Sequence, residues 1–246
     1  MDVLSLLGIV VGIAAILAGN SAEGGSASAL INGPAALIVL GGTCGAGLLQ
    51  TPLPHLRSAL KMALWIFVPP QYDFEKEKKK ILNWAAIARR EGLLGLENLS
   101  DTEKNAFAQR GLQMMVDGSE PQSIRNAMET DAYLQEQREL GGAYFFEAMG
   151  GYAPTIGIIG AVLGLIQVMT HLADPAELGS GIAVAFVATI YGVALANLLL
   201  LPMANKLRSI VAERTALCEM QIEGIVSIAD GEHPRSIQLK LAGFFG

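Results

Sequence analysis

Charged side chains are scarce in this sequence, and four long stretches contain no Asp, Glu, Lys or Arg at all. These four residue types make up 16% of the 246 residues, against about 25% in ordinary soluble domains. The uncharged stretches are Val3 to Gly19, Gly33 to Leu49, Ala153 to Leu172 and Gly181 to Ala204. Crossing a bilayer core takes roughly 17 to 25 helical residues. The sequence therefore predicts an all-α membrane protein with four transmembrane helices.

Cysteine and histidine are too rare and too scattered to indicate a disulfide framework or a metal site. Cys44 lies inside an uncharged stretch and Cys218 far downstream of it. The histidines show no metal-ligand spacing and stand at His55, His171 and His233. The glycine-rich "GGTCGAG" from Gly41 lacks the Lys-Ser/Thr pair of a phosphate-binding loop, and no serine stands in a nucleophile elbow. We expect no metal, no cofactor and no enzymatic activity.

The distribution of basic residues predicts how the chain crosses the membrane. Of the 17 Lys and Arg residues, 12 lie between Pro52 and Gly150, and the other five follow Pro202. The two short connections that begin at Asn20 and Ala173 contain none. Cytoplasmic segments are richer in Lys and Arg than external ones. We therefore expect both termini and the long loop in the cytoplasm, and both short connections outside.

These stretches divide the chain into four predicted regions. Residues 1–51 hold transmembrane helices 1 and 2, 52–152 a cytoplasmic helical domain, 153–204 transmembrane helices 3 and 4, and 205–246 a cytoplasmic helical tail. A signal peptide is the alternative for the first stretch, but such peptides open with positive charge, and here only Asp2 precedes it. The net charge of -6 is spread over segments of mixed sign and predicts no binding to nucleic acid.

Helix start and stop signals subdivide the long loop. Asp73 is suited to cap the start of one helix and Gly92 to stop it. The capping box "SDTE", from Ser100 to Glu103, predicts a second helix that runs to Val116. We expect all of this loop to be helical, because no strand pattern competes.

Two copies of the pattern D-G-x-x-P-x-S-I, at Asp117 and Asp230, mark further helix boundaries. Glycine commonly follows the end of a helix, and proline commonly occupies the first turn of the next. We interpret both copies as helix boundaries rather than binding sites. A helix is expected from Pro121 into the third uncharged stretch, with a bend at Gly141 and Gly142, and a short terminal helix after the second copy.

Small residues recur at helical spacing in three of the uncharged stretches. Each glycine would cost a soluble helix roughly 1 kcal/mol relative to alanine, but in lipid small residues let helix backbones approach closely. One face of the third stretch carries Gly157, Gly160 and Gly164, and the fourth includes Gly192. A similar face begins at Gly8 in the first stretch. These faces predict contacts with further copies or another membrane protein; packing within one monomer is the alternative.

The uncharged stretches also lack the group that ion carriers need. Such proteins generally place an ionisable side chain at membrane depth, where it is costly and functional. If this chain takes part in ion transport, the titrating carboxylate must therefore come from a partner.

The order of two spans, a large helical loop, two spans and a charged tail resembles the flagellar motor stator A subunits, the MotA/PomA family. The resemblance covers essentially the whole chain. It is carried by "MDVLSLLG" at the start, "INGPAALIVLGGT" from Ile31, "ARREGLLGLE" from Ala88, "MMVDG" from Met114, "FEAMGGYAPTIGIIGAVLGL" from Phe146, "VATIYGVALAN" from Val187, "LPMANKLR" from Leu201 and "ADGEHPRSI" from Ala229. Within the family, the chain is most similar to the MotC-type subunits that pair with a MotD-type partner.

The resemblance implies a multi-pass stator subunit of the bacterial inner membrane, which couples ion flow to torque on the rotor. It implies a pentamer of this chain around a dimeric B-type subunit, MotB- or MotD-like, that supplies the membrane aspartate. The rotor protein FliG is the implied cytoplasmic partner. Arg89 and Glu97 match the family's rotor contacts, with Arg90 beside them. Asn98 departs from members that carry a second acid at that position.

The resemblance also assigns roles within the spans. Pro154 and Pro202 match two prolines at the cytoplasmic ends of the third and fourth spans, where they are expected to couple ion occupancy to loop movement. Thr189 matches a hydroxyl position that lines the ion path. Ala161 stands where sodium-driven members carry a threonine, so one sodium ligand is missing and H+ is the expected ion.

Two other functions remain open at the level of the sequence. One is a proton-driven energiser of the ExbB/TolQ kind, which has three spans. The other is a non-conducting membrane scaffold, which would pass no ions even with its partner present.

Overall fold

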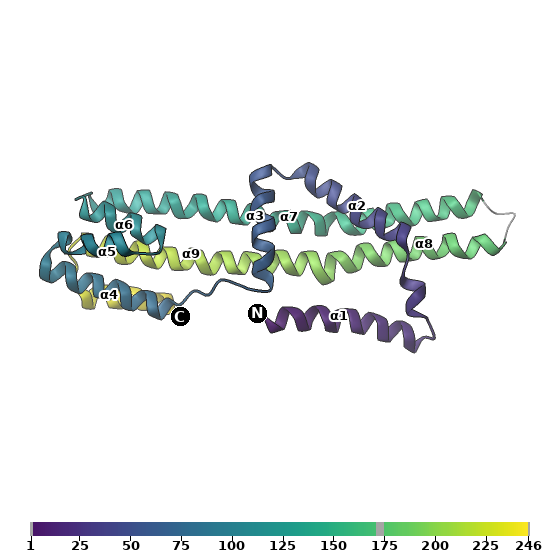
Figure 1. Cartoon of the computed structure of the whole chain (residues 1–246), viewed down its shortest axis with the longest axis horizontal. Helices are drawn as coiled ribbons and strands as arrows, with labels where there is room; N and C mark the ends of the chain where they lie inside the picture. The colour runs from purple at the N-terminus through teal and green to yellow at the C-terminus, as the bar shows by residue number, and fades with distance from the viewer. Residues whose placement is uncertain (1, 171–174, 246) are drawn as a thin grey trace. The chain divides into compact units, whose positions relative to one another are not determined.

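The structure, a computed structural model, describes residues 2–170 and 175–245 (Figure 1). The described residues contain helices and no β-strand, which confirms the predicted all-α class. Four helical segments are long and apolar enough to cross a membrane, and they lie within Val3–Ala22, Ala27–Gln50, Pro121–Thr170 and Gly181–Ala229. His171 and the start of the connection at Ala173 lie outside the described residues.

The chain divides into two compact units. We call the first the membrane unit; it comprises Met1–Pro69 and Arg138–Ser209. We call the second the loop–tail unit; it comprises Pro70–Gln137 and Ile210–Gly246. Two long helices, α7 (Pro121–Thr170) and α9 (Leu201–Ala229), contribute residues to both units.

The membrane unit is built from short and long helices that carry the apolar stretches. Besides its parts of α7 and α9, it contains α1 (Val3–Ala22), η1 (Ala27–Leu30), α2 (Gly33–Gln50), α3 (Leu53–Ala63), η2 (Leu64–Ile66), α8 (Pro175–Ala194) and η4 (Leu195–Leu200). Asp2 caps α1 by accepting a hydrogen bond from the Leu4 N–H at 3.0 Å, and Asn32 caps α2 through the Ala35 N–H at 3.0 Å. Such caps satisfy backbone donors that a helix start leaves unpaired.

One apolar cluster of the membrane unit joins α2 to α8 through small side chains. Ala35 and Val39 of α2 are buried against Val187 and Ala188 of α8, and Figure 1 shows α2 beside this helix. By contrast, none of the residues of α1 is buried within the chain. Exposed apolar faces of this extent are normal where lipid or another membrane protein covers them.

The predicted bend at Gly141 and Gly142 is wrong, because α7 is one helix from Pro121 to Thr170. Both glycines are buried and serve close packing instead. A Cβ at Gly141 would lie 2.7 Å from the His55 ring, and one at Gly142 would lie 3.0 Å from the Ala59 backbone nitrogen. The missing side chains therefore let α3 lie directly against α7.

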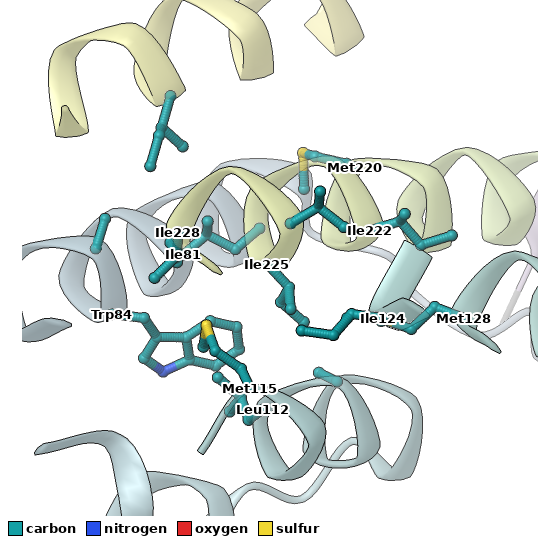
Figure 2. Packing of buried hydrophobic residues seen from close by; sticks show 14 of the residues in the cluster. Ile81, Trp84, Leu112, Met115, Ile124, Met128, Met220, Ile222, Ile225 and Ile228 are labelled. Atoms are coloured by element: carbon teal, nitrogen blue, oxygen red, sulfur yellow. The ribbon is translucent and has the colours of Figure 1, made fainter. Parts of the chain in front are cut away.

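The loop–tail unit has the larger apolar core. Its elements, besides parts of α7 and α9, are α4 (Phe74–Glu91), η3 (Leu93–Leu96), α5 (Glu97–Thr102), α6 (Ala106–Val116), α10 (Pro234–Ala242) and η5 (Gly243–Phe245). Figure 2 shows Trp84 of α4 packed with Leu112 and Met115 of α6, beside Ile124 of α7 and Ile225 of α9. All five side chains are at most 2% exposed. Burial of this kind stabilises a fold by about 1.5–3 kcal/mol per large apolar side chain.

Helix boundaries in this unit agree with the sequence in part. Asp73 caps α4 and Gly92 ends it, as predicted. The capping box from Ser100 is wrong, because α5 runs through Ser100 and α6 starts afresh with Asn105 as its cap. The Ser100 hydroxyl instead donates to Gln113 Oε1 at 3.2 Å. Asn105 stands immediately before the apolar run, so it is the better-placed cap.

Both D-G-x-x-P-x-S-I segments lie at helix boundaries, as predicted. Gly118 and Gly231 have φ values of 76° and 74°, in the left-handed region that glycine reaches at little cost. Pro121 and Pro234 are the first residues of the helices that follow.

Candidate functional site

The closest backbone approach in the membrane unit joins α7 to α8 through glycine. A Cβ at Gly157 would lie 2.9 Å from the Ala188 carbonyl oxygen, and one at Gly164 would lie 2.9 Å from the Ala185 nitrogen. A Cβ at Gly192 would lie 2.4 Å from the Ala153 carbonyl oxygen. Because these neighbours are backbone atoms, a side chain there would force the two helices apart.

Gly160 belongs to the same interface through side-chain contact. A Cβ there would lie 2.8 Å from the Cβ of Ala188 and 3.4 Å from Ile38 of α2. The structure thus brings together Gly157, Gly160, Gly164 and Gly192, the four glycines singled out for helix packing. Their contacts are made within one chain, so these positions fit the monomer alternative rather than the expected contact with further copies.

Thr189 and Ala161, the two expected ion-path positions, lie on the two helices of this interface. The Thr189 hydroxyl donates to the Ala185 carbonyl oxygen of its own helix at 3.3 Å, and its side chain is half-buried. Ala161 is also half-buried and follows Gly160 on α7. The Thr189 oxygen retains lone pairs that can accept a further hydrogen bond.

Pro154 lies inside α7, next to the closest helix contact. It has no N–H to donate to the carbonyl of Gly150, so one backbone hydrogen bond of the helix is missing there. Its neighbour Ala153 is the residue that meets Gly192. The sequence placed Pro154 at the cytoplasmic end of the third span, and in the structure α7 continues for more than four turns beyond it.

Pro202 also lies inside helical structure, and the sequence did not predict the distortion before it. Residues Leu195–Leu200 form the π-helical segment η4, and α9 begins at Leu201. Pro202 cannot donate to the carbonyl of Leu198, and a π-turn is a common adjustment where the regular ladder is interrupted. Such turns recur at functional sites, which makes the Pro202 segment the most unusual backbone of the fourth span.

Lys206, one turn after Pro202, joins three parts of the membrane unit, and sequence reasoning missed it. Its Nζ forms an ion pair with the Asp2 carboxylate and donates to Ser5 Oγ at 2.6 Å and to the Ile66 carbonyl oxygen at 2.7 Å. The hydrogen bond from Lys206 holds the pKa of Asp2 below its usual value. One feature of the sequence could have indicated this ion pair. Asp2 is the only charged residue before the first span, and Lys206 is the first charged residue after the fourth span.

The expected rotor contacts lie at one end of α4 and the start of α5 in the loop–tail unit. Arg89 and Glu97 are exposed, and none of the ion pairs among the described residues involves either of them. Arg90 differs, because its guanidinium pairs with Glu91 at 3.3 Å. Two charges of opposite sign therefore stand free at this end of the unit.

A network of fixed charges joins α7, α9 and α10 within the same unit. Arg125 of α7 donates to Glu223 of α9 at 2.8 Å, and Lys240 of α10 lies 3.1 Å from Glu223 and 2.5 Å from Glu232. The Arg125 hydrogen bond lowers the pKa of Glu223, and the Lys240 hydrogen bond lowers the pKa of Glu232. Glu232 in turn raises the pKa of Lys240. These ion pairs attach α10 to the rest of the unit.

Known proteins match the chain across nearly its full length. Residues 99–220 match the model of the MotA/TolQ/ExbB proton channel family. Motility protein A of Bacillus subtilis is 38% identical over 242 residues, covering 98% of this chain and 90% of the relative. Chemotaxis protein PomA of Vibrio alginolyticus is 32% identical over 244 residues, covering 99% and 95%.

Two solved structures share the fold. The structure of C. jejuni MotAB superposes with a TM-score of 0.95 at 30% identity and covers 100% of this chain and 96% of that one. The flagellar MotAB stator complex of Bacillus subtilis gives a TM-score of 0.88 at 35% identity, with coverages of 98% and 95%.

Proposed function

Because this chain belongs to the MotA/TolQ/ExbB proton channel family and is a stator subunit of the motility protein A kind, we propose that it couples proton flow to rotor torque together with a MotB-type partner. The observation that carries the proposal is the absence of Asp, Glu, Lys and Arg from all four predicted spans. A conducting site then requires a carboxylate from the partner, since a titrating group at membrane depth is the usual means of carrying an ion. The structures similar to this chain are MotAB complexes, which supports such a partner.

The assembly we propose is a pentamer of this chain around the membrane helices of a dimeric B subunit, in the bacterial inner membrane. Both termini, the residues of the 52–152 region and the 205–246 tail lie in the cytoplasm, as the distribution of Lys and Arg favours. The exposed apolar side chains of α1 support burial in lipid or against other subunits. Four candidate spans favour this function over the three-span ExbB/TolQ alternative.

We further propose that the transported ion is H+. Sodium must exchange its water shell for oxygen ligands, whereas a proton needs a carboxylate and a hydrogen-bonded route. Ala161 supplies no side-chain oxygen, so the Thr189 hydroxyl, which donates to Ala185 and keeps its lone pairs, is the single side-chain oxygen that the two positions offer. The two positions together make a poor sodium site, and membership of a proton channel family supports the same ion.

Pro154 and Pro202 are proposed to couple occupancy of the ion site to loop movement. Each removes one backbone hydrogen bond from a helix that contributes to both units. Neutralising and recharging the partner carboxylate would shift the relative stability of two conformers, which commonly differ by a few kcal/mol. Helices lacking a hydrogen bond at these positions can bend there at low cost.

The rotor-contact role of Arg89 and Glu97 is tested by charge reversal. We expect Arg89→Glu or Glu97→Lys to reduce motility while leaving membrane abundance unchanged, because neither side chain forms an ion pair with any residue that the structure describes. Exposed pairs contribute about 0.2–1 kcal/mol each, so each single reversal gives a partial defect. The double reversal should be worse, and an opposite charge on FliG should restore part of the swimming.

The substitution Lys104→Glu is the control for a change of charge elsewhere on the same unit. Lys104 is exposed and forms no ion pair with the described residues. This variant should swim normally. Normal swimming of the double Arg89 and Glu97 variant would show that these residues only face solvent.

A further inference from the structure

A pocket of about 390 Å³ opens beside Arg89 in the loop–tail unit. Its walls are the last turns of α4 and the turn that joins α9 to α10, both at the left of Figure 1. The lining combines small apolar residues with polar edges: Ala85, Ala88, Arg89, Gly92, Leu93, Ile228, Ala229, Gly231 and Glu232. The second D-G-x-x-P-x-S-I segment therefore meets the expected rotor-contact residue.

The mouth of this pocket is kept open by backbone. Gly92 and Gly231 both have positive φ, 78° and 74°, so other residues are disfavoured there. A Cβ at either position would meet no atom within 4 Å. The two turns therefore contribute only backbone atoms to the lining of the pocket at these positions.

The two charged residues of the lining, Arg89 and Glu232, differ in whether they are hydrogen-bonded within the chain. The carboxylate of Glu232 accepts hydrogen bonds from Lys240 at 2.5 Å and from the Ser236 hydroxyl at 3.0 Å, so it is fixed by its own chain. Arg89 has no such partner among the described residues and remains exposed. Of the two charges, only the cation is available to a binding partner, which favours an anionic group opposite it.

We propose that this pocket is the apolar half of the rotor-contact surface: it receives an apolar side chain of the rotor protein, next to a rotor carboxylate that pairs with Arg89. The inference rests on the proposed function, because it deepens the role given there to Arg89. An exposed ion pair alone contributes little, whereas a side chain buried in a pocket can anchor an interface. The pocket of about 390 Å³ is large enough to admit an aliphatic or aromatic side chain, and most of its lining residues are apolar.

The test compares two leucine substitutions on α4. Ala88→Leu places an isobutyl group in the pocket, whereas Ala86→Leu adds the same group on the exposed face of the same helix, outside the lining. Binding of the purified rotor protein to the purified A–B complex is measured for each variant. We expect Ala88→Leu to weaken binding about tenfold or more, as for the loss of a buried apolar contact, and Ala86→Leu to leave it unchanged.

Folding and access are checked in the same complexes. Thermal unfolding of the purified complexes checks that both variants remain folded, because Ala88 packs beside the apolar core of the loop–tail unit. If Ala88→Leu lowers the midpoint, the labelling experiment that follows decides. With Ala88→Cys, in a background carrying Cys44→Ala, the rotor protein should slow labelling by a maleimide. With Ala86→Cys, it should not.

The outcomes separate this inference from the proposed function. Parent-like binding of Ala88→Leu, with weakened binding of Arg89→Glu, would overturn the pocket and leave the rotor role of Arg89 in place. Equal weakening by Ala86→Leu would also overturn it, because the effect would then be general to α4. Parent-like binding of both Ala88→Leu and Arg89→Glu would contradict the proposed rotor surface itself.

Discussion

Replacing Gly192 by alanine should destabilise the membrane unit and abolish motility. The added Cβ would lie 2.4 Å from the Ala153 carbonyl oxygen and 3.1 Å from the Gly157 Cα. These are backbone atoms, so no rotamer change relieves the clash and α8 must move away from α7. Overpacking of this kind costs about 1–3 kcal/mol, more than the roughly 1 kcal/mol that alanine contributes through helix propensity.

The matched control is Gly151→Ala on α7. Gly151 is exposed, and a Cβ there would meet nothing within 4 Å, so only the gain in helix propensity remains. Thermal unfolding of the purified protein in detergent should show a lower midpoint for Gly192→Ala and an equal or higher one for Gly151→Ala. If both variants unfold like the parent, the close α7–α8 contact does not contribute to stability.

Proton conduction should be lost entirely when the partner is missing. In liposomes, the purified chain should give only background flux, whereas the complex with its B subunit should conduct. Replacing the partner's membrane aspartate by asparagine should return the flux to background. The reason is that none of the four predicted spans supplies a charged side chain, and a neutral apolar path does not stabilise an ion in the membrane.

The energy released by ion flow is sufficient to shift such a complex between conformers. One charge that crosses a potential of 100 mV releases about 2.3 kcal/mol, which is comparable with the few kcal/mol that separate conformers of a protein. Flux from the chain alone at the level of the complex would contradict the requirement for a partner carboxylate and would favour a path formed by this chain's own residues.

The membrane spans were predictable because a simple physical rule defines them. Lipid demands long uncharged helices. Three of the four stretches fall within candidate spans of the structure, and the third, Ala153 to Leu172, does so up to Thr170, where the described part of that helix ends. Helix caps next to apolar runs were predictable for the same local reason, as at Asp73. The family resemblance, confirmed by relatives that match nearly the whole chain, added the expectation of a stator subunit.

Features that depend on contacts between distant segments were not predictable. Gly141 was expected to bend α7, but it makes room for His55, which lies far away in sequence. Pro202 was expected at the cytoplasmic end of the fourth span, but the sequence did not predict the π-helical segment that precedes it within continuing helix. The ion pair of Asp2 with Lys206 joins residues at opposite ends of the chain.

The sequence names candidate site residues, but it does not show how they are arranged. Sequence resemblance marked Arg89, Arg90 and Glu97 together. The structure distinguishes them, because Arg90 pairs with Glu91 while the other two have no ion pair. Nor did the sequence connect Arg89 with the turn at Gly231, although both lie at the same pocket.

Swimming driven by these stators alone distinguishes proton coupling from sodium coupling. A host that lacks its own stators would carry this chain and its B subunit, and its speed would be followed while sodium is removed and then while a protonophore is added. The account predicts that speed persists without sodium and collapses with the protonophore, because Ala161 and Thr189 leave too few oxygen ligands for sodium. Strict dependence on sodium, with no effect of the protonophore, would contradict it.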